Sequence, residues 1–404
     1  MKILYLLCLL LFCNNTFSQN YSMENNLFFL SNDAMQGRLV GSESEKKCAN
    51  YIAQIFESYH LKPIYNNFFQ EFETVYNSNP HDSLKGNPIH IKSQNVVGFL
   101  DNNSDKTIVI GAHYDHIGKN EYRQSLAPQL QNQIHNGADD NASGVAGLLE
   151  LAKRFTTNDE KENFNFIFVC FSGEEIGLIG SKAFVENITS VRKIDMMINM
   201  DMIGRVDSEN HLYIGGVGTS PLFLDYFTKN KSEYFNIVID NSGIGPSDHT
   251  SFYLKDIPVL FFFTGSHSDY HKPSDDYEKI NLVGLKETVN FIETLTLKLS
   301  VETKIPFTKT KTKSEGRSTS FKVTLGILPN YSNSETGLLI DNVTENKPAD
   351  KAGLKQGDII IGINKCKVTD IYSYMDCLSK LKHGETIKIF FLRDNKKYKV
   401  KTIV

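Results

Sequence analysis

Two adjacent carboxylates, Glu174 and Glu175, lie in the stretch FSGEEIG directly after the apolar run FNFIFVC. Neighbouring like charges repel each other, and a carboxylate loses favourable hydration when it is buried. A pair of this kind at the end of a buried strand is stabilised by a cation, or by a proton that keeps one carboxyl neutral. The stretch therefore predicts a cation site or a shared proton.

Carboxylate and imidazole side chains also follow the other apolar runs of the chain. Taken singly, most such residues are turn, cap or ordinary buried groups. Taken together, they would place many carboxylates along one edge of the sheet. These carboxylates would repel one another unless cations lay between them. Oxygen and imidazole ligands without thiolates suit zinc, with manganese or cobalt as alternatives. The set consists of His113, Asp115, Asp139, Asp140, Glu174, Glu175, Asp201, Asp248, His249 and His271.

Alternating strand and helix patterns would position these residues. Buried strands are predicted in KTIVIGAHYD, FNFIFVCFS, IDMMINMDMIG and IPVLFFFTG. One helix is predicted after Ser42, its N-cap, and ends before Pro63; a second follows GADDN and can be capped by Ser143 or Asn141. Apolar strands separated by helices predict a mostly parallel sheet covered on both faces, with its site at the carboxyl ends of the strands.

The composition is that of an ordinary globular protein. The 404 residues are 40% apolar and include 27 Phe, so the chain can bury a large core in two or three domains. A formal net charge of -4 provides no basic surface, and we exclude nucleic acid as a partner. The cysteines after the N-terminal segment show no CxxC or metal spacing and are predicted to be buried thiols rather than disulfides. They are Cys48, Cys170, Cys366 and Cys377.

The N-terminal stretch MKILYLLCLLLFCNNTFSQN predicts a secretory signal that is cleaved after Ser18. Its apolar part is too short to span a bilayer, and no later segment predicts a transmembrane helix. Lipid attachment through Cys13 is the weaker interpretation, because Phe12 is bulky where a lipoprotein signal has a small residue. We therefore expect an exported protein, either periplasmic or extracellular.

The motifs HYD, GADDNASG, SGEE, MDMIG, SDH and YHKPSDD, in this order, resemble those of the co-catalytic zinc aminopeptidases of peptidase family M28. The resemblance covers roughly residues 27–299 and includes the segment QGRLVGSESE. It implies an α/β fold: a three-layer α/β/α sandwich around a central mixed, mostly parallel sheet. It also implies a pair of zinc ions, which in such sites lie about 3.5 to 4 Å apart.

The resemblance also implies five metal ligands in this chain. Asp140 would bridge both ions. His113 and Asp201 would complete the first site, and Glu175 and His271 the second.

Further residues have implied roles in the reaction. Glu174 would act as general base: it would accept a proton from a zinc-activated water, which attacks the scissile carbonyl, and return the proton to the leaving amine. Asp115 would accept the second ring N–H of His113 and fix its tautomer. Asp139 would shape its loop.

Four residues near these motifs have less specific expectations. Asp248 would support the site near the substrate amine, or would cap a loop. Tyr270 would line the substrate pocket, or would serve in packing. His116 and His249 are expected not to bind metal, because the ligand set is complete without them.

The chain beyond residue 300 is different in character. Residues 301–319 are rich in Lys, Thr and Ser and predict a solvated linker between a peptidase domain, residues 19–300, and a second domain. Residues 320–404, with the signature PADKAGLKQGDIIIGIN, resemble a small β-barrel-like PDZ domain. The resemblance implies that the loop TLGI receives a peptide C-terminal carboxylate; the alternative is a domain that only packs against the first. The loop residues concerned are Leu325, Gly326 and Ile327.

Three functions agree with these motifs. The leading one is a secreted zinc aminopeptidase that hydrolyses N-terminal residues from peptides. The second is a glutaminyl cyclase, an acyltransferase that has the same fold and one zinc ion. The substrate pockets of such cyclases are usually built with tryptophans, and this chain contains no tryptophan. The third is a non-catalytic peptide-binding protein that uses the PDZ domain. The complete ligand set and Glu174 argue against the third.

Overall fold

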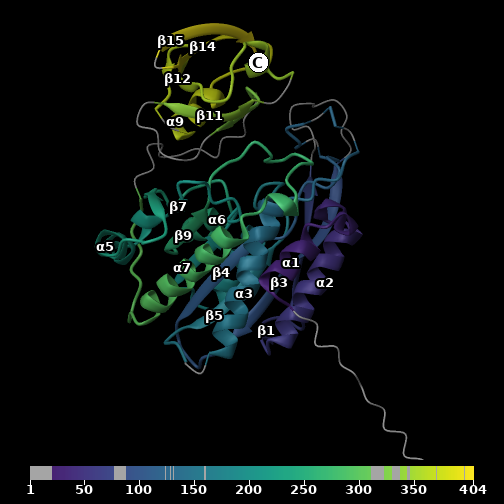
Figure 1. Cartoon of the computed structure of the whole chain (residues 1–404), viewed down its shortest axis with the longest axis vertical. Coiled ribbons are helices and arrows are strands. Elements are labelled where there is room, and N and C mark those ends of the chain that lie inside the picture. Colours follow the sequence, from purple (N-terminus) through teal and green to yellow (C-terminus); the bar gives the residue numbers. More distant parts are fainter. Residues whose placement is uncertain are drawn as a thin grey trace, which may run out of the picture.

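The computed structural model describes residues 21–76, 88–122, 124–127, 129–130, 132–158, 161–310, 323–329, 337–343, 346–369, 371–394 and 396–404. A larger α/β unit is followed by a smaller unit of residues 323–404 (Figure 1). The predicted signal, residues 1–18, and residues 311–319 of the predicted linker lie outside the described residues. The domain boundaries at residues 300 and 320 stay predictions.

The larger unit has helices and strands in alternation. Its strands are β1 (Lys62–Pro63), β2 (Phe69–Tyr76), β3 (Ile89–Leu100), β4 (Thr107–His113), β5 (Asn165–Phe171), β6 (Met196–Met200), β7 (His211–Gly215), β8 (Asn236–Ile239) and β9 (Val259–Phe263). Its α-helices are α1 (Met23–Leu30), α2 (Glu43–Ser58), α3 (Gly144–Thr157), α4 (Ile179–Val191), α5 (Pro221–Lys229), α6 (His249–Tyr253) and α7 (Leu282–Ser300). Short 3-10 or π turns are η1 (Asp33–Arg38), η2 (Ala138–Ser143), η3 (Val217–Thr219) and η4 (Tyr277–Lys279).

The strands form one mixed sheet in the order β1-β3-β5-β4-β6-β9-β7-β8, with β2 paired to β3. The central pairs β5–β4, β4–β6 and β6–β9 are parallel, as is β7–β8. Strand β3 and the β7–β9 pair are antiparallel. The predicted α/β/α sandwich with a mixed sheet is confirmed, but parallel pairing is limited to the centre and to β7–β8.

Helices cover both faces of this sheet, because the central strands are apolar on both sides. Every residue of β4, β5 and β6 is buried. Helices α2, α3 and α7 pack on one face (Figure 1). Helices α4 and α6 pack on the other face. Ser42 caps α2 as predicted, since its side chain accepts from the Glu45 amide at 3.1 Å. Such burial on both faces fixes the strand ends where the predicted ligands lie.

The first residues of the predicted linker are packed against the α/β unit. Ile305 is 5% exposed and belongs to the main core, and Phe307 packs against Tyr253 of α6. The Thr308 amide donates to the Thr219 carbonyl at 2.7 Å, and the Thr310 amide donates to the Tyr253 hydroxyl at 3.1 Å. The prediction of a solvated segment is therefore wrong for residues 305–310, because two apolar side chains anchor them.

The smaller unit is an antiparallel sheet with two short helices. Its strands are β10 (Ile327–Pro329), β11 (Leu338–Val343), β12 (Ile359–Ile363), β13 (Cys366–Lys367), β14 (Thr386–Arg393) and β15 (Lys396–Ile403), and its helices are α8 (Pro348–Lys351) and α9 (Ile371–Ser379). Strand β10 lies at one end of the order β10-β11-β12-β14-β15. It follows the predicted carboxylate loop, in which Leu325 is buried and Gly326 has a left-handed φ of 71°.

The cysteine prediction is half right. Cys48 and Cys170 are buried free thiols, as expected. Cys366 and Cys377 form a disulfide that joins β13 to α9, which corrects the prediction of four thiols. Strand β13 and helix α9 contact each other, so cysteines 11 residues apart meet without a CxxC pattern.

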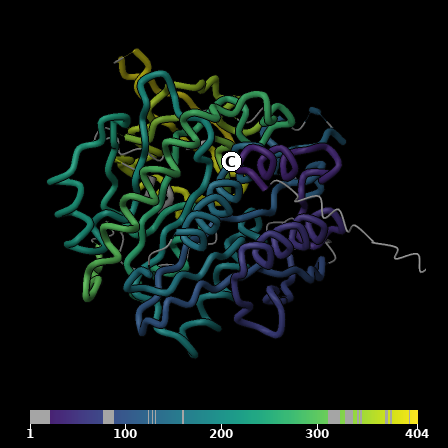
Figure 2. The backbone as a smooth tube through the Cα atoms, turned by 60° about the horizontal axis from the view of Figure 1, so that its bottom comes forward, coloured from purple at the N-terminus to yellow at the C-terminus, as the bar shows by residue number. Residues whose placement is uncertain are grey.

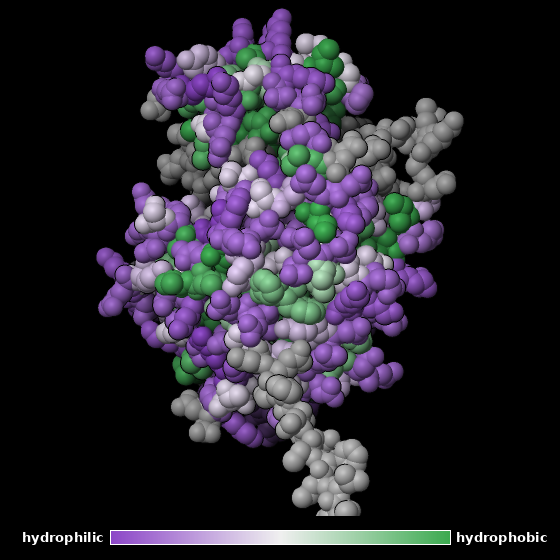
Figure 3. All heavy atoms as spheres, turned by 45° about the vertical axis from the view of Figure 1, so that its right-hand side comes forward, coloured by the Kyte–Doolittle hydropathy of each residue, from purple (hydrophilic) through white to green (hydrophobic). Residues whose placement is uncertain are grey.

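The surface drawn in Figure 3 is mostly hydrophilic, with hydrophobic side chains scattered over both units. Among the described residues, no helix combines the length and apolar character needed to cross a bilayer.

Candidate metal centre

The predicted site residues meet at the carboxyl edge of the central strands. His113 is the last residue of β4, and Asp201 directly follows β6, which pairs with β4 in parallel. Glu175 follows β5, and His271 lies in the loop after β9. Asp140 lies in η2, before α3. Residues far apart in the sequence are thus brought together by the sheet, as expected for this edge.

A first group of possible ligand atoms surrounds one carboxylate oxygen of Asp140. The His113 Nε2 atom lies 3.2 Å from Asp140 Oδ1 and 3.4 Å from Asp201 Oδ1. His113 is fully buried, and all three ligand atoms lie within 4.8 Å of one another.

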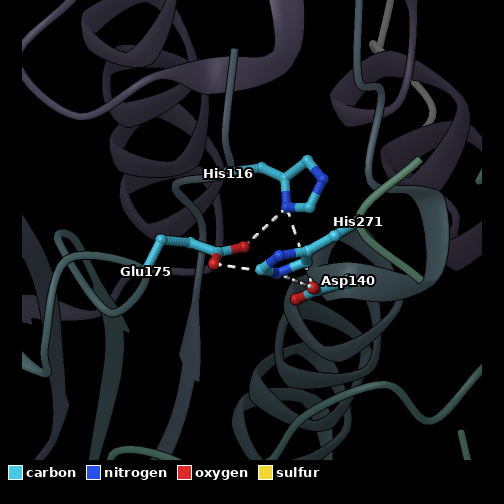
Figure 4. Close-up of side chains that lie close together, drawn as sticks. All are labelled: His116, Asp140, Glu175 and His271. Carbon is cyan, nitrogen blue, oxygen red and sulfur yellow. Dashed lines mark hydrogen bonds and ion pairs between the residues drawn. The ribbon is translucent and has the colours of Figure 1, made fainter. Parts of the chain in front are cut away.

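A second group surrounds the other oxygen of Asp140 (Figure 4). The His271 Nε2 atom lies 3.2 Å from Asp140 Oδ2 and 3.0 Å from Glu175 Oε2. His116, expected to stay out of the site, points into this group. Its Nδ1 atom lies 2.7 Å from Glu175 Oε1 and 3.8 Å from Asp140 Oδ2.

These separations fit zinc ligands. Ligands at about 2.0–2.1 Å from a tetrahedral zinc lie about 3.3–3.5 Å from one another, close to the distances seen in both groups. The His271 Nε2 atom is buried and has no hydrogen-bond partner among the described residues, although it faces two carboxylates. Although burial opposes it, contacts with His113 and His271 hold the pKa of Asp140 well below its ordinary value. The carboxylate that faces both groups therefore favours its anionic form, which is suited to a cation.

The surroundings of Glu174 and Glu175 shift the pKa values of the two carboxyls in opposite directions. Burial raises the pKa of Glu174 well above its ordinary value, against the lowering effect of His113. The carboxylates of Asp201 and Asp248 act in the same direction as burial. By contrast, although burial opposes it, His271 helps to lower the pKa of Glu175 to about 2. The two adjacent carboxyls are thus pushed apart in basicity, which is the pattern expected of one ligand and one proton acceptor.

Asp115 holds the backbone of both glutamates. Its carboxylate accepts from the Glu174 amide at 3.2 Å and from the Glu175 amide at 3.4 Å. The His113 Nδ1 atom lies 3.2 Å from the Asp115 carbonyl and 3.7 Å from its carboxylate. The acceptor nearest to this ring nitrogen is therefore the main-chain carbonyl of Asp115.

The loop that carries Asp140 is held by two buried acids. Asp139 accepts from the Gly204 amide at 2.7 Å and from the Ser143 hydroxyl at 3.0 Å. Asp275, for which no role was predicted, accepts from the amides of Asp139 and Asp140 at 3.1 Å. Asp139 thus shapes the loop, and Asp275 fixes its backbone.

Asn141, rather than Ser143, provides the side-chain cap of helix α3; the sequence allowed either residue. Its Oδ1 atom accepts from the Gly144 amide at 3.0 Å, at the start of α3, and from the Met202 amide at 3.2 Å. The Asn141 side chain also donates to the Met200 carbonyl at 2.9 Å. Ser143 makes no such capping bond. One side chain thereby ties the Asp140 turn to the backbone on both sides of Asp201.

Arg38 connects the N-terminal segment to two of the ligand loops. Its guanidinium is fully buried and donates to the carbonyls of Tyr114, Asn136 and Gly137 at 2.8, 2.6 and 3.0 Å. It also donates to the Leu30 carbonyl at 2.6 Å. Figure 2 shows the N-terminal helices, in purple, along one side of the α/β unit. A buried cation that bonds several carbonyls fixes the loops that carry them.

A loop that the sequence could not place covers His271. The His271 Nδ1 atom lies 3.1 Å from the Gln124 carbonyl, and the Leu126 amide donates to the His271 carbonyl at 3.0 Å. A carbonyl at Nδ1 leaves Nε2 as the nitrogen that faces the carboxylates. No local motif marks Gln124, because its contribution is made by the backbone.

The remaining predicted residues lie near the centre. Asp248 is fully buried, and burial raises its pKa to about 7; it makes no side-chain cap to α6, so the capping alternative is wrong. Tyr270 stacks on His271 with ring centroids 4.0 Å apart and lines a small cavity beside Asp140. His249 lies outside both ligand groups and stacks on Phe261, and burial lowers its pKa to about 3.

Comparisons with known proteins agree with this fold. The model of peptidase family M28 matches residues 95–296, and that of the PDZ domain matches residues 323–404. Leucine aminopeptidase 1 of Uncinocarpus reesii is 30% identical over 207 residues, which are 46% of this chain and 49% of the relative. The chain thus spans about half the length of that curated relative.

Two solved structures share the fold. BSAP, a zinc aminopeptidase from Bacillus subtilis, has a TM-score of 0.53 and 18% identity, with 69% of this chain and 94% of that chain covered. Glutaminyl cyclase from Porphyromonas gingivalis has a TM-score of 0.54 and 17% identity, with 69% and 97% covered. At these identities the likeness concerns the fold alone.

Proposed function

The chain belongs to peptidase family M28, and on this premise we propose that it is a zinc-dependent aminopeptidase that holds two zinc ions. One observation carries the proposal. The two carboxylate oxygens of Asp140 face different ligand groups, with Oδ1 3.2 Å from His113 Nε2 and Oδ2 3.2 Å from His271 Nε2. A carboxylate between two groups of this kind is suited to bridge two cations.

The residues of the chain divide the work of the reaction. Bound zinc would lower the pKa of a water molecule and would polarise the scissile carbonyl. His113 and Asp201 would hold one ion, and Glu175 and His271 the other, with Asp140 shared. Glu174 accepts a proton as the water oxygen bonds to the carbonyl carbon, and then donates this proton to the amine as the C–N bond breaks. The raised pKa of Glu174 suits a group that must both take up and release a proton.

The substrate end of the site favours an N-terminal residue. A cavity of about 50 Å³ adjoins Asp140 and Asp201 and is lined mainly by apolar or aromatic side chains: Met202, Pro246, Phe261, Phe263 and Tyr270. A small cavity beside the metal ligands accommodates a terminal side chain better than the middle of a chain. This supports removal of single residues from peptide N-termini.

A glutaminyl cyclase is the second candidate, because a cyclase shares the fold. A cyclase needs only one zinc ion, whereas the two carboxylate oxygens of Asp140 face two different ligand groups, one with His113 and one with His271. The two functions are separated by a parallel assay of leucyl p-nitroanilide and an N-terminal glutaminyl peptide, with zinc content measured in the same preparation. Chelator-sensitive anilide hydrolysis with two zinc ions per chain supports the peptidase. Cyclisation of the glutaminyl peptide without anilide hydrolysis contradicts it.

We propose further that the protein is exported. The N-terminal signal pattern supports export, and so does the Cys366–Cys377 disulfide, because disulfides persist in oxidising compartments. Mass spectrometry of the purified mature chain tests this. We expect an N-terminus at Gln19 in the periplasmic or extracellular fraction, and a full-length chain confined to the cytoplasm would contradict the proposal.

The PDZ domain is proposed to bind a peptide C-terminus. Strand β10 ends the sheet order, and the left-handed Gly326 turns the chain directly before it. An edge strand can accept an added peptide strand, with the terminal carboxylate at the loop of residues 325–327. Titration of the full chain with a C-terminal peptide library and its amidated counterparts tests the idea, since equal binding of amidated peptides would contradict carboxylate recognition.

A further inference from the structure

A second cavity adjoins the metal-side cavity. It has a volume of about 360 Å³, and Phe263 and Ser266 line both spaces. Its polar wall includes Arg205, Asp207 and His267. A substrate group that passes Phe263 would therefore meet charged side chains rather than an apolar wall.

Arg205 has spare hydrogen-bonding capacity in this wall. Its Nη2 atom lies 3.3 Å from Asp269 Oδ2, at the long end of an ion-pair contact. Asp269 already accepts from Lys279 and from Ser274, so its charge is shared. The Nη1 atom of Arg205 is buried and has no hydrogen-bond partner among the described residues. A guanidinium with five donors is thus held mainly by one long contact.

His267 is a second donor with an unused nitrogen. Its Nε2 atom lies 3.1 Å from Asp139 Oδ2, whereas Nδ1 is buried without a partner among the described residues. Although burial opposes it, the contact with Asp139 raises the pKa of His267. The ring therefore has one nitrogen committed to Asp139 and one nitrogen without a partner among the described residues.

The carboxylate of Asp207, the acidic residue of this wall, already has hydrogen-bond partners within the protein. Asp207 Oδ2 lies 2.7 Å from His211 Nδ1, and Asp207 Oδ1 accepts from the amides of Glu209 and His211 at 3.0 Å. Its charge is compensated by these donors. Among the described residues that line this cavity, the buried donors without a partner belong to Arg205 and His267, and they suit an acceptor that carries negative charge.

We propose that this cavity binds a carboxylate of the substrate through Arg205 and His267. The inference rests on the proposed aminopeptidase function, which brings a peptide to the adjoining ligands. An arginine fork binds a carboxylate with two parallel hydrogen bonds, and such charged bonds are stronger than neutral ones. The carboxylate has two sources: the acidic side chain of an N-terminal residue, or the free C-terminus of a dipeptide.

A different role for Arg205 must be separated from this one. Through Asp269, Arg205 also touches the loop that carries His271. If it only positioned that loop, its loss would slow all substrates equally. A carboxylate contact instead affects only substrates that bear the carboxylate, which makes the ratio of two substrates the decisive readout.

The test uses the zinc-loaded full chain and two substrate pairs. Glutamyl and leucyl p-nitroanilide report an acidic side chain, and Leu-Gly and its amide report a free C-terminus. We expect kcat/KM to favour the carboxylate-bearing member of one pair, which identifies the source. Arg205→Met should lower that value about 10- to 100-fold, the scale of charged hydrogen bonds, and change the uncharged member less than about threefold.

Arg192→Met is the matched control, because Arg192 follows α4 and lies near the start of β6, at the opposite edge of the sheet. It should leave both substrate ratios unchanged. Zinc content and thermal midpoint establish that each variant is folded. The unmodified protein gives an independent reading: added NaCl should raise KM for the preferred carboxylate substrate and leave its uncharged partner unaffected.

The outcomes are distinct. Wild-type hydrolysis of leucyl anilide without preference for either carboxylate overturns this inference and leaves the peptidase proposal standing. Equal loss on all substrates in Arg205→Met also overturns it, in favour of loop positioning. Absence of hydrolysis of every substrate by the zinc-loaded chain overturns the proposed function and this inference with it.

Discussion

The two ligand groups of the metal centre are held in different ways. In the first, His113 and Asp201 lie at the ends of β4 and β6, whose backbones are paired by hydrogen bonds in the sheet. In the second, His116, Glu175 and His271 lie on loops and depend on one another and on Gln124. Ladder hydrogen bonds fix the first group more firmly than loop contacts fix the second. We therefore expect the first group to bind zinc more tightly.

The largest effect is expected for the residue that both groups share. Asp140→Ala removes a ligand atom from each group, so both zinc ions should be lost and peptide hydrolysis should become undetectable. Elemental analysis after gel filtration gives the zinc content. Asp225→Ala, an exposed surface acid paired with Lys229, is the control and should retain full metal. A variant at Asp140 that still held two tightly bound zinc ions would refute the bridging role.

The next effect separates proton transfer from metal binding. Glu174→Gln keeps the shape of the side chain but removes its basic oxygen. Turnover should fall by about 100-fold or more, which is the usual contribution of a general base. Zinc content should remain that of the wild type, as measured by elemental analysis. Loss of zinc, or an unchanged kcat, would show that Glu174 does not have this role.

A smaller effect distinguishes the loop-held group from the strand-held group. His116→Leu removes the 2.7 Å contact with Glu175, and affinity for the second zinc should fall about 10- to 100-fold, as when a ligand loses its supporting partner. Competition with a chromophoric chelator measures the two affinities separately. His116→Asn is the matched variant, because its amide nitrogen can replace Nδ1 and should restore most of the affinity. Equal weakening of both sites by His116→Leu would contradict the distinction.

The smallest effect on catalysis is expected outside both groups. A chain that ends after Ser300 loses the contacts of Ile305 and Thr310, whereas one that ends after Thr310 keeps them. We expect the shorter chain to lose about 2 to 4 kcal/mol of unfolding free energy, from one buried side chain and its hydrogen bonds. The longer chain should match full-length kcat on a small anilide. Urea unfolding and steady-state kinetics measure both quantities, and a large kcat loss in the longer chain would implicate the PDZ domain in the site.

The same contrast explains what the sequence could predict. His113 and Asp201 could be found because buried strands are recognisable from their apolar runs and end at one edge. His116 could not, since its place beside Glu175 depends on how two loops fold over each other. Asp275 acts on backbone amides more than 130 residues away, and Gln124 acts through its carbonyl, so neither leaves a local pattern.

The sheet and its helices were predicted for the same reason as the strand-end ligands, because burial on both faces leaves a periodic signal. The docking of residues 305–310 was missed, because Ile305 and Phe307 are too few to form a period. The Cys366–Cys377 disulfide was missed because the pairing depends on the contact between β13 and α9, which the spacing of the cysteines does not reveal.

Arg38 makes the metal centre dependent on the order in which the chain folds. Its bonds span 76, 98 and 99 residues, so they form only after distant parts of the chain have closed on one another. Contacts of such sequence separation carry a loop-closure cost that delays their formation. A chain that has formed its central strands but has not docked its N-terminal segment lacks the cation that joins the His113 and Asp140 loops. We therefore expect the chain to take up metal only at the final stage of folding, once its whole α/β unit has closed.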